Sequence, residues 1–199
     1  RDAGPVVDAV SFLRSVASGE RPVIGRKVAV YGGGNTAMDA ASESSRLGAD
    51  SVILAYRRGK EEMGAYDFEY DLAKGVGVKG LFNVAPVEII GNGYVAGVKF
   101  IRTATIDGSV HEIPGSEFIE PCDMVIKATG QAKQTAFLGL IPGLTLDSKG
   151  RIVADAHTGQ TSNPKYFASG DAWNGGAEVV NAAAEAKLTA RGIHTYLSK

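Results

Sequence analysis

Residues 27–41 read Lys-Val-Ala-Val-Tyr-Gly-Gly-Gly-Asn-Thr-Ala-Met-Asp-Ala-Ala. The first five residues predict a short buried strand, and the last six continue into a helix that we expect over 36–47. Between them, Gly32-x-Gly34-x-x-Ala37 has the spacing of a dinucleotide-binding turn. There the first glycine permits the tight turn, the second lets a pyrophosphate approach the backbone, and the small third residue allows close helix packing. The alternative is a glycine-rich strand–helix turn that holds no nucleotide.

The next apolar run indicates which dinucleotide this turn would take. Residues 51–56 predict a second, parallel strand, which completes a βαβ unit. NAD-binding units carry Asp or Glu near the end of this strand, whereas here Arg57 and Arg58 follow Tyr56. Guanidinium groups suit the 2′-phosphate of NADP(H), so we expect NADP(H) rather than NAD(H). An exposed arginine pair on a solvated surface is the simpler alternative.

Composition excludes several other classes of protein. The net charge of −1 lacks the positive footprint of a nucleic-acid binder, and no apolar run approaches the length of a membrane span. The single cysteine, Cys122, rules out an internal disulfide and a four-cysteine metal or iron–sulfur site. A cytoplasmic protein that binds neither nucleic acid nor membrane is therefore expected.

The remaining elements predict an α/β fold, a Rossmann-like parallel sheet with an inserted antiparallel β-meander. A helix is expected at 6–16 and another at 65–74. Antiparallel strands are expected near 78–84, 87–90, 94–103 and 110–113, and a return to a parallel strand at 123–129. Asn92-Gly93 and Asp107-Gly108 are typical of hairpin turns.

After a boundary near residue 130 the pattern changes. We expect a hairpin at 144–154, a strand at 166–168 and a helix at 177–197.

Two later stretches carry further candidate binding residues. Ala128-Thr129-Gly130 ends a parallel strand, where open α/β sheets bind ligands, although a strand that simply stops at a glycine reads the same way. Ser169-Gly170-Asp171, followed by Glu178-Val179-Val180, combines a strand end, an acidic residue and a new helix N-terminus. That arrangement suits a second anionic cofactor, whereas Asp171 could instead cap a local turn.

Other residues with possible chemistry are given structural roles. The three histidines lie in different segments without metal-ligand spacing, so no metal site is expected. Cys122 is expected to be a packed thiol, and Glu61-Glu62 a solvated approach to a helix. Trp173 could cover a flavin or pack a loop, and the sequence leaves both open.

Taken together, these motifs resemble the glutamate synthase small (beta) subunit family, which includes the flavin module of dihydropyrimidine dehydrogenase. Residues 25–39 resemble its NADPH-domain signature. The resemblance continues through Tyr56-Arg57-Arg58 with Glu61-Glu62-Met63, through Pro114 to Glu117, through Ala128 to Gln131, and through Tyr166 to Ala183. Its fold is a three-layer ββα-type nucleotide-binding domain.

The resemblance implies a flavin-dependent oxidoreductase that passes hydride from NADPH to FAD and on to a partner. It implies a linker helix at 1–24, an NAD(P)H-binding domain at 25–130 and the C-terminal part of an FAD-binding domain at 131–199. The implied NADPH ligands are Gly32, Gly33, Gly34, Asn35, Thr36, Arg57, Arg58, Ala128, Thr129 and Gly130. The implied FAD neighbours are Gly170, Asp171, Glu178, Val179 and Val180. No catalytic residue is expected, because hydride transfer needs geometry rather than a protein acid or base.

Members of this family also have an earlier glycine loop for FAD and a cysteine-rich region for iron–sulfur clusters. Neither occurs in the 199 residues. We therefore expect a fragment that binds NADP(H), holds FAD poorly and lacks turnover. Its expected partners are the missing N-terminal FAD and iron–sulfur portion and a large catalytic subunit. The alternatives are a non-catalytic NADP(H)-binding or interaction module, and a self-sufficient NADP dehydrogenase for which no substrate acid or base is found.

Overall fold

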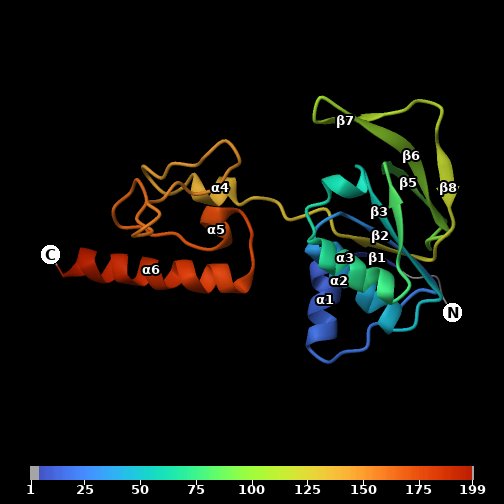
Figure 1. Cartoon of the computed structure of the whole chain (residues 1–199), viewed down its shortest axis with the longest axis horizontal. Helices are drawn as coiled ribbons and strands as arrows, with labels where there is room; N and C mark the ends of the chain where they lie inside the picture. The colour runs from blue at the N-terminus through green and yellow to red at the C-terminus, as the bar shows by residue number, and fades with distance from the viewer. Residues whose placement is uncertain (1–4, 199) are drawn as a thin grey trace. The chain divides into compact units, whose positions relative to one another are not determined.

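A computed structural model describes residues 5–198 of the chain. It contains two compact units that divide after Gly130 (Figure 1). The first four residues of the segment expected at 1–24 lie outside the described residues, as does Lys199.

A five-stranded parallel sheet forms the centre of the first unit. Its strands are β1 (Val6–Asp8), β2 (Lys27–Tyr31), β3 (Ser51–Tyr56), β4 (Lys79–Phe82) and β9 (Met124–Lys127). They are arranged in the order β1-β9-β2-β3-β4, and every neighbouring pair is parallel. The chain runs outward from β2 through β3 to β4, whereas β9 lies on the other side of β2. The topology therefore reverses between β2 and β9, and parallel α/β sheets bind ligands at such a point.

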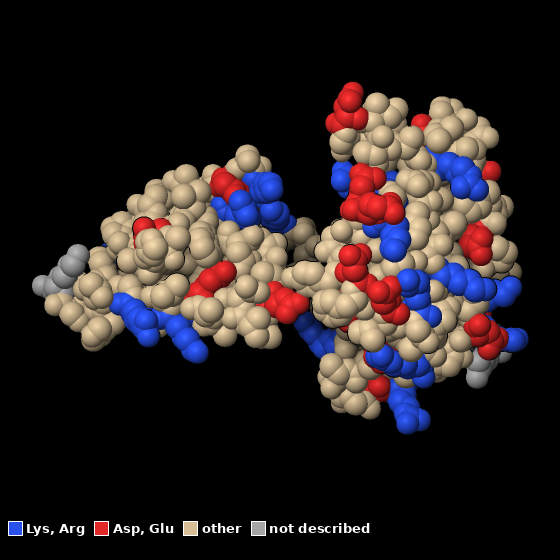
Figure 2. Space-filling view, viewed as in Figure 1, with Lys and Arg blue, Asp and Glu red and all other residues tan. Residues whose placement is uncertain are grey.

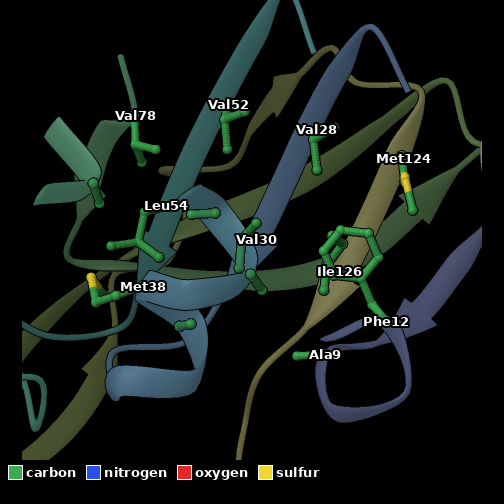
Figure 3. Close-up of a cluster of buried hydrophobic side chains, with 14 of the residues drawn as sticks. Ala9, Phe12, Val28, Val30, Met38, Val52, Leu54, Val78, Met124 and Ile126 are labelled. Atoms are coloured by element: carbon green, nitrogen blue, oxygen red, sulfur yellow. The ribbon is translucent and has the colours of Figure 1, made fainter. Parts of the chain in front are cut away.

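Three helices cover one face of this sheet, namely α1 (Ala9–Ala17), α2 (Asn35–Arg46) and α3 (Asp67–Gly75). The 3-10 helix η1 (Lys60–Glu62) lies between β3 and α3 in the chain. Side chains from the helices and from β2, β3 and β9 interleave in one buried cluster (Figure 3). Its labelled members are Ala9, Phe12, Val28, Val30, Met38, Val52, Leu54, Val78, Met124 and Ile126.

An antiparallel sheet covers the opposite face. It consists of β5 (Val84–Ile90), β6 (Gly97–Ile106), β7 (Ser109–Glu112) and β8 (Phe118–Glu120), with β6 paired to all three others. Val98 and Phe100 of β6 pack in a second buried cluster with Ala29, Ala55 and Val125 of the parallel sheet. Strands buried on both faces need continuous apolar runs, which explains the patterns seen in the sequence. The expected three-layer ββα arrangement is confirmed.

Several predicted elements differ in detail. The helix expected at 6–16 begins only at Ala9, because the Asp8 side chain accepts hydrogen bonds from the amides of Val10 and Ser11 and caps the helix. The residues before Asp8 instead form β1. The strand predicted near 78–84 as part of the meander is instead β4, which extends the parallel sheet beside β3. β8 was not predicted.

The two predicted turns behave differently. Asp107-Gly108 is a two-residue hairpin turn between β6 and β7, and both residues have positive φ angles. Asn92-Gly93 lies in the connection from Gly91 to Ala96 that joins the antiparallel strands β5 and β6, so the predicted hairpin is confirmed but its loop is longer than two residues. Gly91 lies so close to the Tyr94 carbonyl that a Cβ would collide with it, which shows how the connection folds back on itself.

The second unit has three helices, α4 (Thr135–Leu138), α5 (Asp171–Asn174) and α6 (Val179–Leu197). An antiparallel bridge between Leu146 and Ile152 forms within the expected hairpin. The strand expected at 166–168 is reduced to one bridge, between Gln160 and Phe167. Within residues 5–198, no helix has both the length and the apolar character required to cross a membrane.

The start of β2 depends on one carboxylate. Asp123 accepts hydrogen bonds from the amides of Arg26 (3.0 Å) and Lys27 (2.8 Å) just before β9 begins. We expect Asp123→Ala to lower the free energy of unfolding by about 1–2 kcal/mol, because both amides lose a charged acceptor. Urea denaturation measures the change. Asp71→Ala is the matched control, since Asp71 forms only an exposed ion pair with Lys74 on α3. An equal loss in both variants would show that Asp123 has no such role.

Candidate functional site

The carboxyl ends of β2 and β9 meet at Gly32. A Cβ on Gly32 would lie 2.3 Å from the carbonyl oxygen of Ala128, so only glycine allows the two backbones this approach. The Ala128 amide also donates to the Tyr31 carbonyl at 2.8 Å. The start of the glycine loop and the 128–130 segment are therefore neighbours at the switch point of the sheet, and Thr129 and Gly130 are exposed there.

The glycine loop ends in an open helix N-terminus. Gly34 is the N-cap of α2, and it has no side chain to cap the helix. Within residues 5–198, the amides of residues 33–36 donate to no protein acceptor. A Cβ on Gly34 would meet no atom within 4 Å. Free amides, the helix dipole and open space together make a site for an anion.

A segment after β3 lies against this loop, which the sequence did not indicate. The Tyr56 ring packs so closely on Gly33 that a Cβ there would lie 2.4 Å away, and its hydroxyl donates to the Glu62 carbonyl at 2.9 Å. The Ala65 amide donates to the Gly33 carbonyl at 3.0 Å. The Asn35 side chain accepts from the Tyr66 amide at 3.0 Å. We call residues 59–66 the strap.

The two arginines at the end of β3 have different surroundings. Arg57 is exposed, and its carbonyl accepts a hydrogen bond from the Thr103 hydroxyl of β6 at 2.8 Å. Burial raises the pKa of Tyr31, and the nearby Arg57 guanidinium partly opposes that increase. The Arg57 charge therefore lies close to the end of β2.

Arg58 is half-buried and turns toward the β6–β7 hairpin. Its Nη2 donates to the Gly108 carbonyl at 3.2 Å. Its Nε is buried and has no hydrogen-bond partner among the described residues. Two arginines that look equivalent in the sequence are thus distinguished by the fold.

Glu62 was expected to be a solvated residue in the approach to a helix. It is exposed, but its carboxylate also accepts from the Gly59 amide at 3.1 Å and from the Thr105 hydroxyl at 2.9 Å. The expectation was therefore incomplete, because Glu62 joins the strap to β6.

In the second unit, one predicted site residue, Gly170, contacts a glutamate that the sequence did not single out. The Glu185 carboxylate on α6 accepts from the Gly170 amide at 2.7 Å and from the Asn174 side chain at 2.9 Å. Gly170 has a φ of +62°, in the region that favours glycine. A glutamate within an alanine-rich helix was the available sequence signal.

The remaining predicted residues of this unit are exposed. Asp171 begins α5, Glu178 is the N-cap of α6, and Val179 and Val180 form its first turn. Trp173 is half-buried on α5. These residues present carboxylates and the N-terminus of a long helix to the surface.

Few other residues suggest a binding or catalytic site. No group of three or more metal-binding side chains is found in the part of the chain that the structure describes. Acidic and basic residues are interspersed on the face seen in Figure 2.

Cys122 is buried in a pocket beside Lys27, Ser51 and Glu120, at the amino end of β2 and β3. This is the end of the sheet opposite the glycine loop.

Comparisons with known proteins identify relatives of the chain. The model of the family described as pyridine nucleotide-disulphide oxidoreductase matches residues 3–186. The glutamate synthase [NADPH] small chain of Escherichia coli (strain K12) is 41% identical over 184 residues, which cover 87% of this chain and 39% of the relative. The NADP(+)-dependent formate dehydrogenase subunit beta of Moorella thermoacetica is 37% identical and covers 98% of this chain and 28% of the relative. The chain thus spans less than half the length of either relative.

A solved structure has the same fold. T. acidophilum thioredoxin reductase aligns with a TM-score of 0.76 and 24% identity, over 97% of this chain and 58% of that one. The likeness supports the Rossmann-type α/β architecture.

Cys122 provides a pH-dependent prediction. Burial raises the pKa of its thiol from 9.0 to about 11, and the nearby Asp123 and Glu120 carboxylates add to the increase. Between these values the unfolded chain loses a proton that the folded chain keeps. Folding stability should therefore fall as the pH rises from 9 to 11. Urea denaturation of the wild type and of Cys122→Ala across this range measures the effect. The variant should lose less stability with pH, and parallel curves would contradict the prediction.

Proposed function

Because this chain belongs to the pyridine nucleotide-disulphide oxidoreductase family, we propose that residues 25–130 bind NADPH and present its nicotinamide for hydride transfer to FAD. The observation that carries the proposal is the open N-terminus of α2. It combines free amides with an unfilled space beside Gly34, at the point where the sheet topology reverses.

The pyrophosphate fits the glycine loop. Residues 33–36 offer backbone donors, and the α2 dipole favours the two phosphate charges. Gly34 allows the phosphates to reach the backbone, because nothing occupies the space where its side chain would be. The side-chain oxygen of Asn35 is already used by the strap, so its role is to hold the loop.

The preference for NADPH rests on the end of β3. Arg57 and Arg58 follow this strand where NAD-binding units carry a carboxylate, and a guanidinium attracts the doubly charged 2′-phosphate. The names of both relatives include NADPH or NADP(+).

The nicotinamide end would lie beside residues 128–130. Bound NADPH supplies the hydride, and the contribution of this chain is to position the ring and exclude water. Ala128 packs on Gly32 and is partly buried. We assign no catalytic residue, since hydride transfer needs none.

Residues of the second unit fit one side of FAD. Asp171 is exposed, so its carboxylate can accept ligand hydroxyls, and the start of α6 at residues 178–180 offers a long helix N-terminus. The Gly170 amide is already bound to Glu185, so it serves to shape the turn. No glycine loop for a second pyrophosphate follows residue 130 in the described chain.

The wider role follows from the relatives. Their names describe a small chain and a beta subunit, so we propose that this region passes electrons to a partner domain or a larger catalytic subunit in the cytoplasm. Flavin and iron–sulfur groups held by other parts of such a protein would receive them.

Nucleotide titration tests the proposal. We expect calorimetry to show NADPH binding roughly tenfold or more tighter than NADH, because the 2′-phosphate gains charge-assisted hydrogen bonds. Gly34→Ala should weaken both nucleotides by roughly tenfold, because its methyl group would occupy the phosphate space. The variant should still fold, since that methyl group meets no protein atom within 4 Å, although alanine is a weaker N-cap for α2 than glycine.

Gly75→Ala provides the matched control for this titration. It adds the same methyl group in open space at the end of α3, and its affinities should equal those of the wild type. Binding of neither nucleotide to the wild type would refute the proposal. A preference for NADH would refute the assignment of the arginines.

The flavin site yields a separate prediction. The purified 199-residue chain should carry no bound FAD, because the proposed FAD neighbours among the described residues would contact only one side of it. Visible absorbance of the purified protein, before and after incubation with FAD and desalting, measures retention. A stoichiometric yellow flavin after desalting would contradict the partial site.

A further inference from the structure

The end of β3 is held by the hairpin that joins β6 and β7. Thr103 of β6 donates to the Arg57 carbonyl, and Gly108 at the turn accepts from the Arg58 guanidinium. Thr105, between them on β6, donates to the Glu62 carboxylate of the strap. Three contacts from one strand and its turn therefore reach both arginines and the strap.

The direction of the Gly108 carbonyl is fixed by the backbone. Asp107 and Gly108 have φ angles of +51° and +76°, and Ile106 pairs with Ser109 across the turn. The backbone of a two-residue turn of this kind matches the twist of the flanking strands and has little conformational freedom. The acceptor for Arg58 is thus part of a defined hairpin.

The Arg58 guanidinium is poorly placed to bind a phosphate by itself. Binding with the Nε side of the guanidinium requires an accessible Nε, and here that atom is buried. Its Nη2 already donates to a carbonyl. Arg57, by contrast, is exposed, and among residues 5–198 its guanidinium has no hydrogen-bond partner, whereas its carbonyl accepts from Thr103.

We propose that the two arginines have divided roles, in which Arg57 contacts the 2′-phosphate and Arg58 is a positioning residue that fastens the β6–β7 hairpin to the end of β3. The antiparallel sheet then sets nucleotide preference without touching the nucleotide. Glu62 is part of the same set of contacts, because the Thr105 hydroxyl of β6 donates to its carboxylate and the Tyr56 hydroxyl of β3 donates to its carbonyl. The Tyr56 ring packs on Gly33 of the glycine loop. This inference rests on the proposed NADPH site.

Four substitutions separate the roles. Arg57→Gln should weaken NADPH binding by roughly tenfold or more, leaving NADH binding and the hairpin unchanged. Arg58→Gln should speed amide hydrogen exchange in residues 106–109 and weaken NADPH binding less than Arg57→Gln does. Arg58→Lys should restore slow exchange, because an ammonium can donate to the Gly108 carbonyl. Thr105→Val replaces the hydroxyl by a methyl group of similar size, and it should also reduce the NADPH preference.

Arg46→Gln is the control for loss of a positive charge. Arg46 lies at the opposite end of α2 from the glycine loop and pairs with Glu43, so its removal should change neither affinity nor exchange. If Arg58→Gln weakens NADPH binding as much as Arg57→Gln while exchange at the hairpin stays slow, Arg58 is a direct ligand and the division of roles is wrong.

Hydrogen exchange also separates failure of this inference from failure of the NADPH site. If the wild type binds neither nucleotide, the proposed function fails, together with the specificity argument. Exchange at residues 106–109 still decides whether Arg58 fastens the hairpin, since it needs no nucleotide.

Discussion

The close approach of Gly32 to the Ala128 carbonyl is the contact on which the first unit depends. It lets β2 and β9 end side by side, although 92 residues, 32–123, separate them in the sequence. Any side chain at residue 32 would collide with backbone that cannot move without disturbing the strand pairing. The open start of α2 and the 128–130 segment share one edge of the sheet because of this contact.

Around that contact, the antiparallel sheet stabilises the first unit from the face of the parallel sheet opposite the helices. The antiparallel sheet buries Val98 and Phe100 against the parallel strands, and β6 extends polar side chains toward the end of β3. The Tyr56 hydroxyl of β3 donates to the Glu62 carbonyl of the strap, and the Ala65 amide of the strap donates to the Gly33 carbonyl of the glycine loop. Local order at the loop thus has contributions from all three layers.

Local signals in the sequence predicted much of this fold. The glycine loop, its flanking strands and the Asp107-Gly108 turn were recognisable because each depends on neighbouring residues. β4 was misassigned because its partner, β3, is chosen by packing over distance. Arg57 and Arg58 have different surroundings because of contacts with a distant segment. The hydrogen bond from the Gly170 amide to the Glu185 carboxylate likewise joins residues that are far apart in the sequence. Sequence patterns carry no record of such contacts.

The buried position of Cys122 has a practical consequence. The thiolate is the reactive form of cysteine, and a pKa of about 11 keeps this thiol protonated at neutral pH. The chain has no other cysteine. A single cysteine introduced at an exposed position, such as Thr129, would therefore be the one fast-reacting thiol, so the protein accepts a fluorophore or spin label at a chosen place without removal of its native cysteine.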